Sequence, residues 1–237
     1  GNMGRKAFIP PTSYSNMGPE SVSEAQAVQG IERAQGAQDF DLIFDRMKMA
    51  IDEMFNVWHK DVSIQSEVYK DFIIKGDDII DVYIPEIRIK YHNAMVVVSY
   101  HIHEDKYYVA TTVLGHDEAI KLEVKVSDSD LRTALRKFKE KTTESFIAYA
   151  NYLLTYSRLI VNSAIESKNF IAIIIAMVTI NPYFINIVMN MADLLYVIGS
   201  LSARRKLKAI VKDIYELDND LLRLRDSLWP GSGFTIP

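Results

Sequence analysis

The spacing of apolar and polar residues changes twice along the chain. From Phe40 to Trp58, apolar residues recur every three or four positions with charged residues between them. This spacing places the apolar side chains on one face and predicts a helix over about residues 39–59. Asp39 is positioned to cap the start of that helix.

After this helix the apolar residues alternate with polar ones at a period of two. Five segments rich in Val, Ile, Tyr and Thr follow one another, separated by short polar turns: 63–75, 78–91, 94–104, 106–114 and 120–126. The pattern predicts an antiparallel meander of four or five strands, with one face covered by the 39–59 helix. Pro85 cannot donate a backbone hydrogen bond, so we expect its strand at an edge or at a bulge.

Beyond residue 127 the period returns to that of a helix and stays so almost to Trp229. Near the end, seven apolar residues occupy successive first and fourth positions of a heptad: Leu207, Ile210, Ile214, Leu217, Leu221, Leu224 and Leu228. Such a seam predicts a helix packed against one or two others. An antiparallel bundle within one subunit and a coiled coil between subunits both fit it, and these seven residues are predicted to form an oligomerisation seam.

The segment 170–199 is the most apolar part of the chain, and residues 169–192 carry no charge. The dipeptide Asn181-Pro182 interrupts it, because a residue before proline avoids the helical region and Pro favours a first helical position. We therefore expect an apolar hairpin of two short helices meeting at a corner, represented by Phe170, Ile174, Asn181, Pro182 and Asp193.

This apolar hairpin has two interpretations. Burial in a bundle or at a subunit interface is favoured because Asn186, Asn190 and Asp193 form a polar stripe on the second helix. Insertion into a membrane is the alternative, because the uncharged run is long enough to span and basic residues follow from Arg204.

Composition narrows the class of protein. Of 237 residues, 49% are hydrophobic, so the chain can bury a substantial core, and none is cysteine, which excludes disulfides and thiolate chemistry. Residues 61–127 hold seven basic and twelve acidic residues, a balance of −5 that argues against nucleic acid. Residues 1–37 are rich in Gly, Pro and Ser and predict an extended arm. No apolar run typical of a secretory signal follows the first residues, which favours an intracellular or virion location.

His101 and His103 are the strongest chemical candidates. A His-x-His pair on a strand points to one face, and with a third ligand from His92, Glu104, His116 or Asp117 it can hold zinc or iron. The simpler interpretation is that both histidines lie on the exposed face of the sheet. We find no phosphate-binding loop and no nucleophile motif, so no catalytic residue and no cofactor is predicted.

These observations predict an α+β chain with an arm (1–37), a helix-plus-sheet module (38–126) and a helical bundle or coiled-coil module with a short tail (127–237). The leading hypothesis is a non-enzymatic assembly subunit, of the virion, phage or secretion-machine type, that forms a homo-oligomer or joins a larger protein complex through its apolar helices. A membrane-active protein and a metal-binding or enzymatic sheet module are the alternatives.

Overall fold

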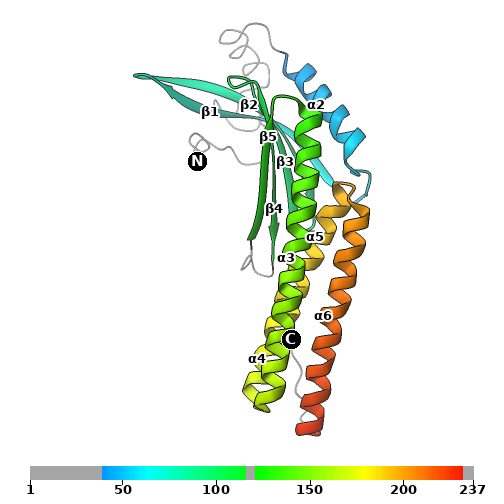
Figure 1. The fold of residues 1–237 in the computed structure, drawn as a ribbon. Coiled ribbons are helices and arrows are strands. Elements are labelled where there is room, and N and C mark those ends of the chain that lie inside the picture. Colours follow the sequence, from blue (N-terminus) through cyan, green and yellow to red (C-terminus); the bar gives the residue numbers. More distant parts are fainter. Residues whose placement is uncertain (1–38, 116–120, 232–237) are drawn as a thin grey trace. The chain divides into compact units, whose positions relative to one another are not determined.

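The computed structural model describes residues 39–115 and 121–231, and these form an α+β chain, as the sequence predicts (Figure 1). The elements occur in this order: α2 (Phe40–Met54), β1 (Ser63–Lys75), β2 (Asp78–Tyr91), β3 (Ala94–His101), β4 (Lys106–Leu114), β5 (Lys121–Asp128), α3 (Leu131–Ser167), α4 (Phe170–Val178), η5 (Thr179–Phe184), α5 (Ile185–Val197) and α6 (Leu201–Leu228). The predicted arm over 1–37 and the last six residues of the predicted tail lie outside the described residues.

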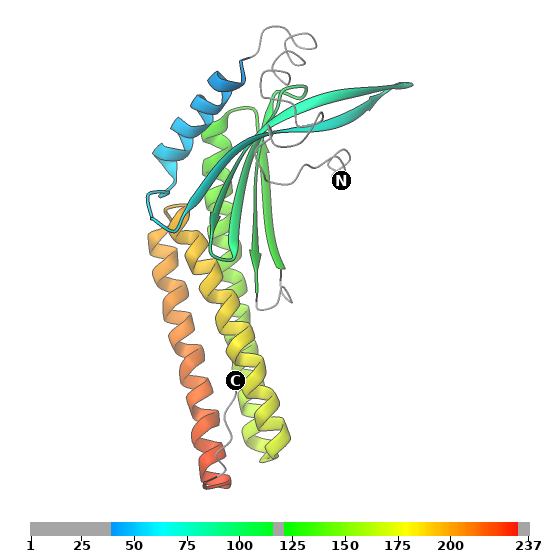
Figure 2. The same cartoon turned by 180° about the vertical axis from the view of Figure 1, so that it is seen from behind.

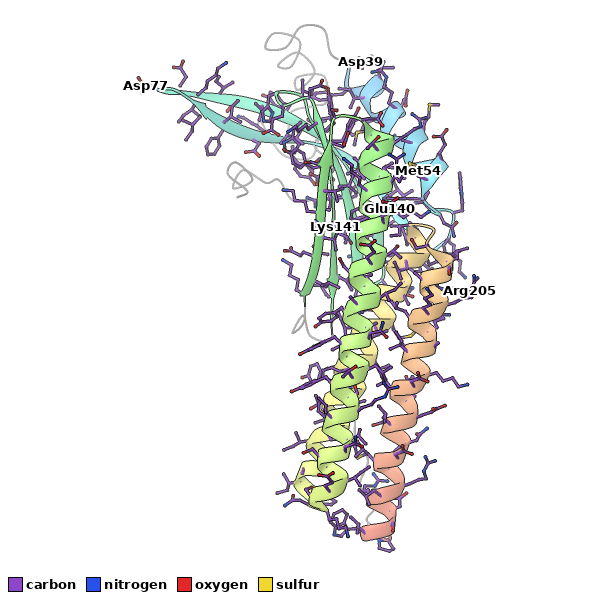
Figure 3. All side chains as sticks on the ribbon, viewed as in Figure 1. Asp39, Met54, Asp77, Glu140, Lys141 and Arg205 are labelled. Atoms are coloured by element: carbon purple, nitrogen blue, oxygen red, sulfur yellow. The ribbon has the colours of Figure 1, made fainter. Side chains whose placement is uncertain are left out.

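The chain divides into two compact units. Unit 1 comprises the described parts of Gly1–Lys90, Met95–Thr111 and Val124–Phe138, and unit 2 those of Tyr91–Ala94, Thr112–Glu123 and Lys139–Pro237. The division differs from the expected boundary at 126–127, because the start of α3 groups with the sheet while several strand ends group with the helices. Glu140 and Lys141 mark the part of α3 where unit 2 begins (Figure 3).

The sheet is a five-stranded meander in the order β1-β2-β3-β4-β5. β1 and β2 pair antiparallel without interruption from Ser63↔Lys90 to Lys75↔Asp78, and Val68 faces Pro85 within this run. Because β2 is an interior strand, the prediction that Pro85 marks an edge or a bulge is wrong. Each residue of an antiparallel strand directs its N–H to one neighbour only, so a proline removes one hydrogen bond and leaves the other ladder intact.

α2 confirms the first predicted helix but is shorter. The Asp39 side chain accepts a hydrogen bond from the Asp41 N–H (2.9 Å), and the helix ends at Met54. Phe40, Phe44 and Met47 are buried in the core of unit 1. Trp58 follows the end of the helix, so its side chain is no longer held on the buried face and is 73% exposed.

The helices of unit 2 form an antiparallel bundle of three long segments: the part of α3 after Phe138, the run α4-η5-α5, and α6 (Figure 2). At one end the Phe170 ring meets Trp229 edge to face, with centroids 4.7 Å apart. Near the other end the hydroxyls of Thr143 and Ser200 lie 2.8 Å apart. These contacts align all three segments over their length.

The chain does not break at Asn181-Pro182, so the predicted hairpin with a corner is wrong. η5 is a π-helix that contains Pro182, and the Ile185 N–H reaches the Ile180 carbonyl five residues earlier. The wider π turn accommodates a residue that lacks an N–H and would clash in a regular α-helix. Phe170–Val197 is therefore one continuous helical segment of 28 residues.

The heptad seam of α6 is filled by the bundle of its own chain. Leu207, Ile210, Ile214 and Leu221 are buried, whereas Leu228 at the end of the helix is exposed. These four residues therefore pack within one subunit, as one of the two sequence interpretations stated. Leu217 and Leu224 are part-exposed, so association of copies through the seam stays a prediction.

The polar stripe of α5 faces its own unit. The buried Asn190 side chain donates to the Leu114 carbonyl (2.5 Å) and to the Asn186 carbonyl (3.2 Å). Asp193 is part-buried, and burial raises the pKa of its carboxyl against the opposing effect of His92 and Arg204. The stripe is thus satisfied by the end of β4 and by neighbouring charges in unit 2.

Replacing Asn190 by Leu should lower the free energy of unfolding by about 1–3 kcal/mol, because the Leu114 carbonyl loses a buried donor. Urea denaturation followed by circular dichroism measures this. Asn186→Ala is the matched control, since it removes one partner of Asn190 and keeps the bond to Leu114. Equal losses in the two variants would show that the bond to Leu114 is not the important one.

Candidate functional site

The two candidate histidines lie where β3 turns into β4. His101 is the last residue of β3, but His103 lies in the four-residue turn that follows, so the expectation of a pair on one strand is wrong. The turn is closed by the Glu104 and Asp105 N–H groups, which donate to the His101 and Ile102 carbonyls. Asp105 adopts a left-handed conformation with φ 52°. The tight turn, rather than strand alternation, brings the imidazoles together.

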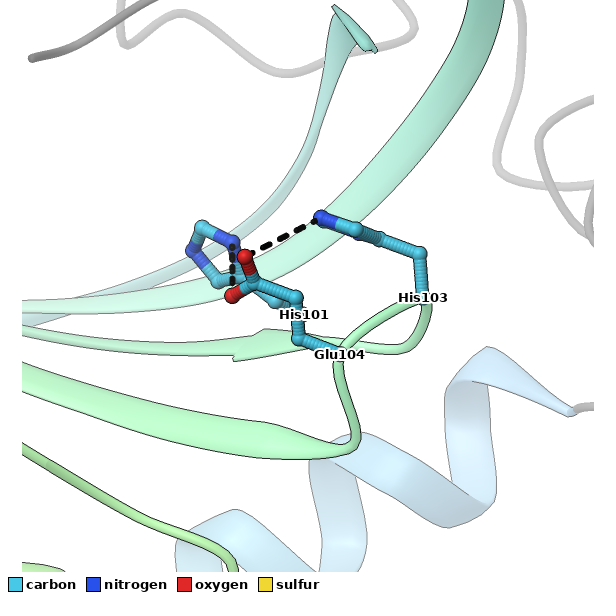
Figure 4. Close-up of side chains that lie close together, drawn as sticks. All are labelled: His101, His103 and Glu104. Atoms are coloured by element: carbon cyan, nitrogen blue, oxygen red, sulfur yellow. Dashed lines mark ion pairs between the residues drawn. The ribbon is translucent and has the colours of Figure 1, made fainter. Parts of the chain in front are cut away.

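The turn gathers His101, His103 and Glu104 into one cluster (Figure 4). One possible ligand atom from each residue lies within 4.8 Å of the other two. The Glu104 carboxylate sits between the rings, 3.9 Å from His101 Nδ1 and 3.8 Å from His103 Nε2. Both histidine side chains are less than a fifth exposed, which contradicts the simpler interpretation of two exposed histidines.

Tyr108 of β4 supports the cluster from outside. Its hydroxyl donates to Glu104 Oε2 (2.6 Å), and its ring packs on His101 with centroids 4.3 Å apart. This hydrogen bond lowers the pKa of the Glu104 carboxyl and raises the pKa of Tyr108 to about 12. The Lys125 ammonium lies 5.1 Å from the centre of the Tyr108 ring. Glu104 is therefore oriented and kept ionised beside both imidazoles.

Of the proposed third ligands, Glu104 is the one that joins the histidines. His92 belongs to unit 2, and His116 and Asp117 lie outside the described residues. Among the described residues, this is the group of three or more His, Asp or Glu side chains with the spacing of a metal site. Two imidazoles and one carboxylate form a ligand set that suits Zn²⁺ and other divalent transition metals.

A second polar cluster, which the sequence did not reveal, is buried between β1 and β2. Glu67 and Glu86 face each other across the two strands, and both are almost fully buried. Tyr69 donates to Glu67 (2.6 Å), and Arg88 Nε donates to Glu86 (2.8 Å) while its guanidinium stacks over the Tyr69 ring. Strand alternation places Glu67 with Tyr69 on one face of β1, and Glu86 with Arg88 on one face of β2. Only the strand register decides that the two carboxylates are opposite each other.

The third candidate is an apolar surface on α4, which we name the α4 outer face: Ile171, Ile174, Ile175 and Val178. Ile171 and Ile175 are 67% and 57% exposed, and the other two are part-exposed. The opposite side of α4 is buried in the bundle through Ile173, Ala176 and Met177. α4 has no polar side chain on any side, although its outer face is in contact with water.

Comparisons with models of protein families, with curated proteins and with solved structures found no match to this chain.

Glu67 gives the buried polar cluster a testable pH dependence. Burial raises the pKa of the Glu67 carboxyl above its ordinary value of 4.5, although Tyr69 and Arg88 act in the opposite direction. A group with a raised pKa stabilises the folded state below its unfolded pKa, and this contribution is lost as the pH rises through the folded-state pKa. As the pH rises above about 4.5, Glu67→Gln should therefore lose less stability than the wild type.

Urea denaturation at several pH values measures this difference. Glu104→Gln is a control of opposite sign, because the pKa of Glu104 is lowered and its contribution is lost as the pH falls. Parallel pH profiles for the wild type and Glu67→Gln would contradict the assignment.

Proposed function

We propose that this protein is a non-enzymatic assembly subunit that associates with a second copy of itself through the α4 outer face. The observation that carries the proposal is that α4 is apolar all round while the bundle covers only one side of it. A helix of this kind is normally buried on every side.

Burial of this face contributes free energy to association. Full burial of an isoleucine side chain contributes about 1.5–3 kcal/mol, and Ile171 and Ile175 are more than half exposed. On the neighbouring α3, Tyr152, Tyr156 and Leu159 form a second exposed apolar row. Tyr152 and Tyr156 stack in parallel, and Tyr156 also packs on Phe184, within the run α4-η5-α5. Rigid aromatic side chains of this type are common at protein interfaces.

A second copy is favoured because the α4 outer face carries no charge. A surface of isoleucine and valine offers nothing for a partner of opposite charge to recognise, but it is complementary to itself. Two-fold contacts use the same patch on both subunits, so one apolar face is enough to form a closed dimer.

Lipid is a poorer partner for the bundle as it is folded. By length and composition, Phe170–Val197 is the one helical segment among the described residues that could cross a membrane. Its 28 residues would extend about 42 Å, more than the roughly 30 Å of a hydrocarbon core. However, α6 also has 28 residues and lies alongside it, as the contact of Phe170 with Trp229 shows.

The outward side of α6 is charged throughout this length. Lys212 and Glu216 are exposed beside the middle of the apolar segment, Arg223 is exposed nearer its α4 end, and Arg205 points away from the bundle (Figure 3). A charged side chain at the centre of a bilayer costs about 2.5–3.5 kcal/mol even on the membrane-insertion scale that gives the smallest values. Membrane insertion would therefore require α6 to separate from the apolar segment.

Sedimentation velocity over a range of concentrations tests the proposal. The wild type should sediment as a dimer or larger, and Ile171→Glu with Ile175→Glu should sediment as a folded monomer, because burying two carboxylates opposes association. Leu201→Glu is the matched control, since Leu201 is an exposed apolar residue of α6 in the same unit.

A monomeric wild type at tens of micromolar would overturn the proposal. Flotation with liposomes separates the lipid alternative: dimerisation without flotation supports the assembly subunit, whereas flotation of a monomeric wild type would assign the α4 outer face to lipid.

A further inference from the structure

We propose that His101, His103 and Glu104 form a binding site for one divalent transition-metal ion, with Zn²⁺ as the expected occupant. The proposal does not depend on self-association. It rests on two imidazoles and one carboxylate that converge within four residues at the end of β3 and the start of the turn.

The donor atoms are close to the spacing that zinc requires. Zinc binds imidazole nitrogen and carboxylate oxygen at about 2.0–2.2 Å, so tetrahedral ligands lie roughly 3.3–3.5 Å from one another. The Glu104 oxygens lie 3.9 Å and 3.8 Å from His101 Nδ1 and His103 Nε2. These two distances end on different carboxylate oxygens, and one possible ligand atom from each of the three residues lies within 4.8 Å of the other two. Side-chain rotation must therefore bring these atoms to the shorter spacing when the ion binds.

The surroundings of the cluster match those of known types of metal site. The Tyr108 hydroxyl binds the Glu104 oxygen that faces His101, and its ring packs on His101. Outer groups of this kind fix the orientation of ligands and contribute to metal affinity. The ionised carboxylate also offsets the charge of the ion, which two neutral imidazoles alone would not do.

Three protein ligands leave the fourth position of a tetrahedral zinc ion for water or an external ligand. The ligands come from the last residue of β3 and from the turn that follows it, so the ion would also fix the conformation of residues 102–105. We therefore expect a metal that stabilises this hairpin and remains accessible to a small anion or to a donor atom of another molecule.

Isothermal titration calorimetry of the full chain with ZnCl₂ tests the site. One zinc ion should bind per chain, and His101→Ala with His103→Ala should weaken binding at least tenfold. His59→Ala is the matched control, because His59 is also a histidine of unit 1, with Asp61 as its acidic neighbour at 3.7 Å, and should leave binding unchanged.

Co²⁺ provides a second readout that does not depend on affinity. Four-coordinate Co²⁺ absorbs visible light strongly, so this absorption should appear with the wild type and with His59→Ala, and should be absent from the double variant. Circular dichroism confirms that the double variant is folded. No stoichiometric zinc binding by the wild type, or equal binding by the wild type and the double variant, would overturn the proposal.

Discussion

The continuous apolar segment Phe170–Val197 is the constraint on which unit 2 depends. A helix with so few polar groups requires cover along its length, and α6 supplies it with a buried apolar seam and a charged outer side. α3 contributes Phe146, Ala150 and Leu153 from the third side. On α4 the bundle covers one side, and the α4 outer face that remains exposed is the basis of the proposed self-association.

Unit 1 has a different organisation, in which polar groups are placed by turns and strand register. The tight turn after β3 brings His101, His103 and Glu104 together, while the pairing of β1 with β2 sets Glu67 opposite Glu86. In both cases a tyrosine hydroxyl donates to a glutamate, Tyr108 to Glu104 and Tyr69 to Glu67. Only the histidine cluster has ligand atoms with the spacing of a metal site among the described residues. It is therefore a candidate binding site, whereas the cluster of Glu67 and Glu86 is a buried polar network.

Periodicity was a reliable guide where an element is long and regular. All five strands and the long final helix occur close to the predicted positions, because a buried face forces period two on a strand and period 3.6 on a helix. Two of the errors fall where a proline has two structural solutions. Pro182 ends many helices but is accommodated here by a π turn, and Pro85 often marks an edge but lies here in an interior strand. Local preference cannot distinguish these outcomes, since neighbouring segments decide them.

The sequence by itself determined the α+β class, the order of its elements, the apolar character of residues 170–180 and the histidine pair as the chemical candidate. Only the tertiary structure decided that the α6 seam is filled within one chain, that the α4 outer face is left uncovered, and that Glu104 completes the histidine cluster. The physical reason is that periodicity reports which side chains share a face of one element. Contacts between residues far apart in the sequence decide which other element covers that face. Turn geometry, which periodicity does not encode, decides which side chains a turn brings together.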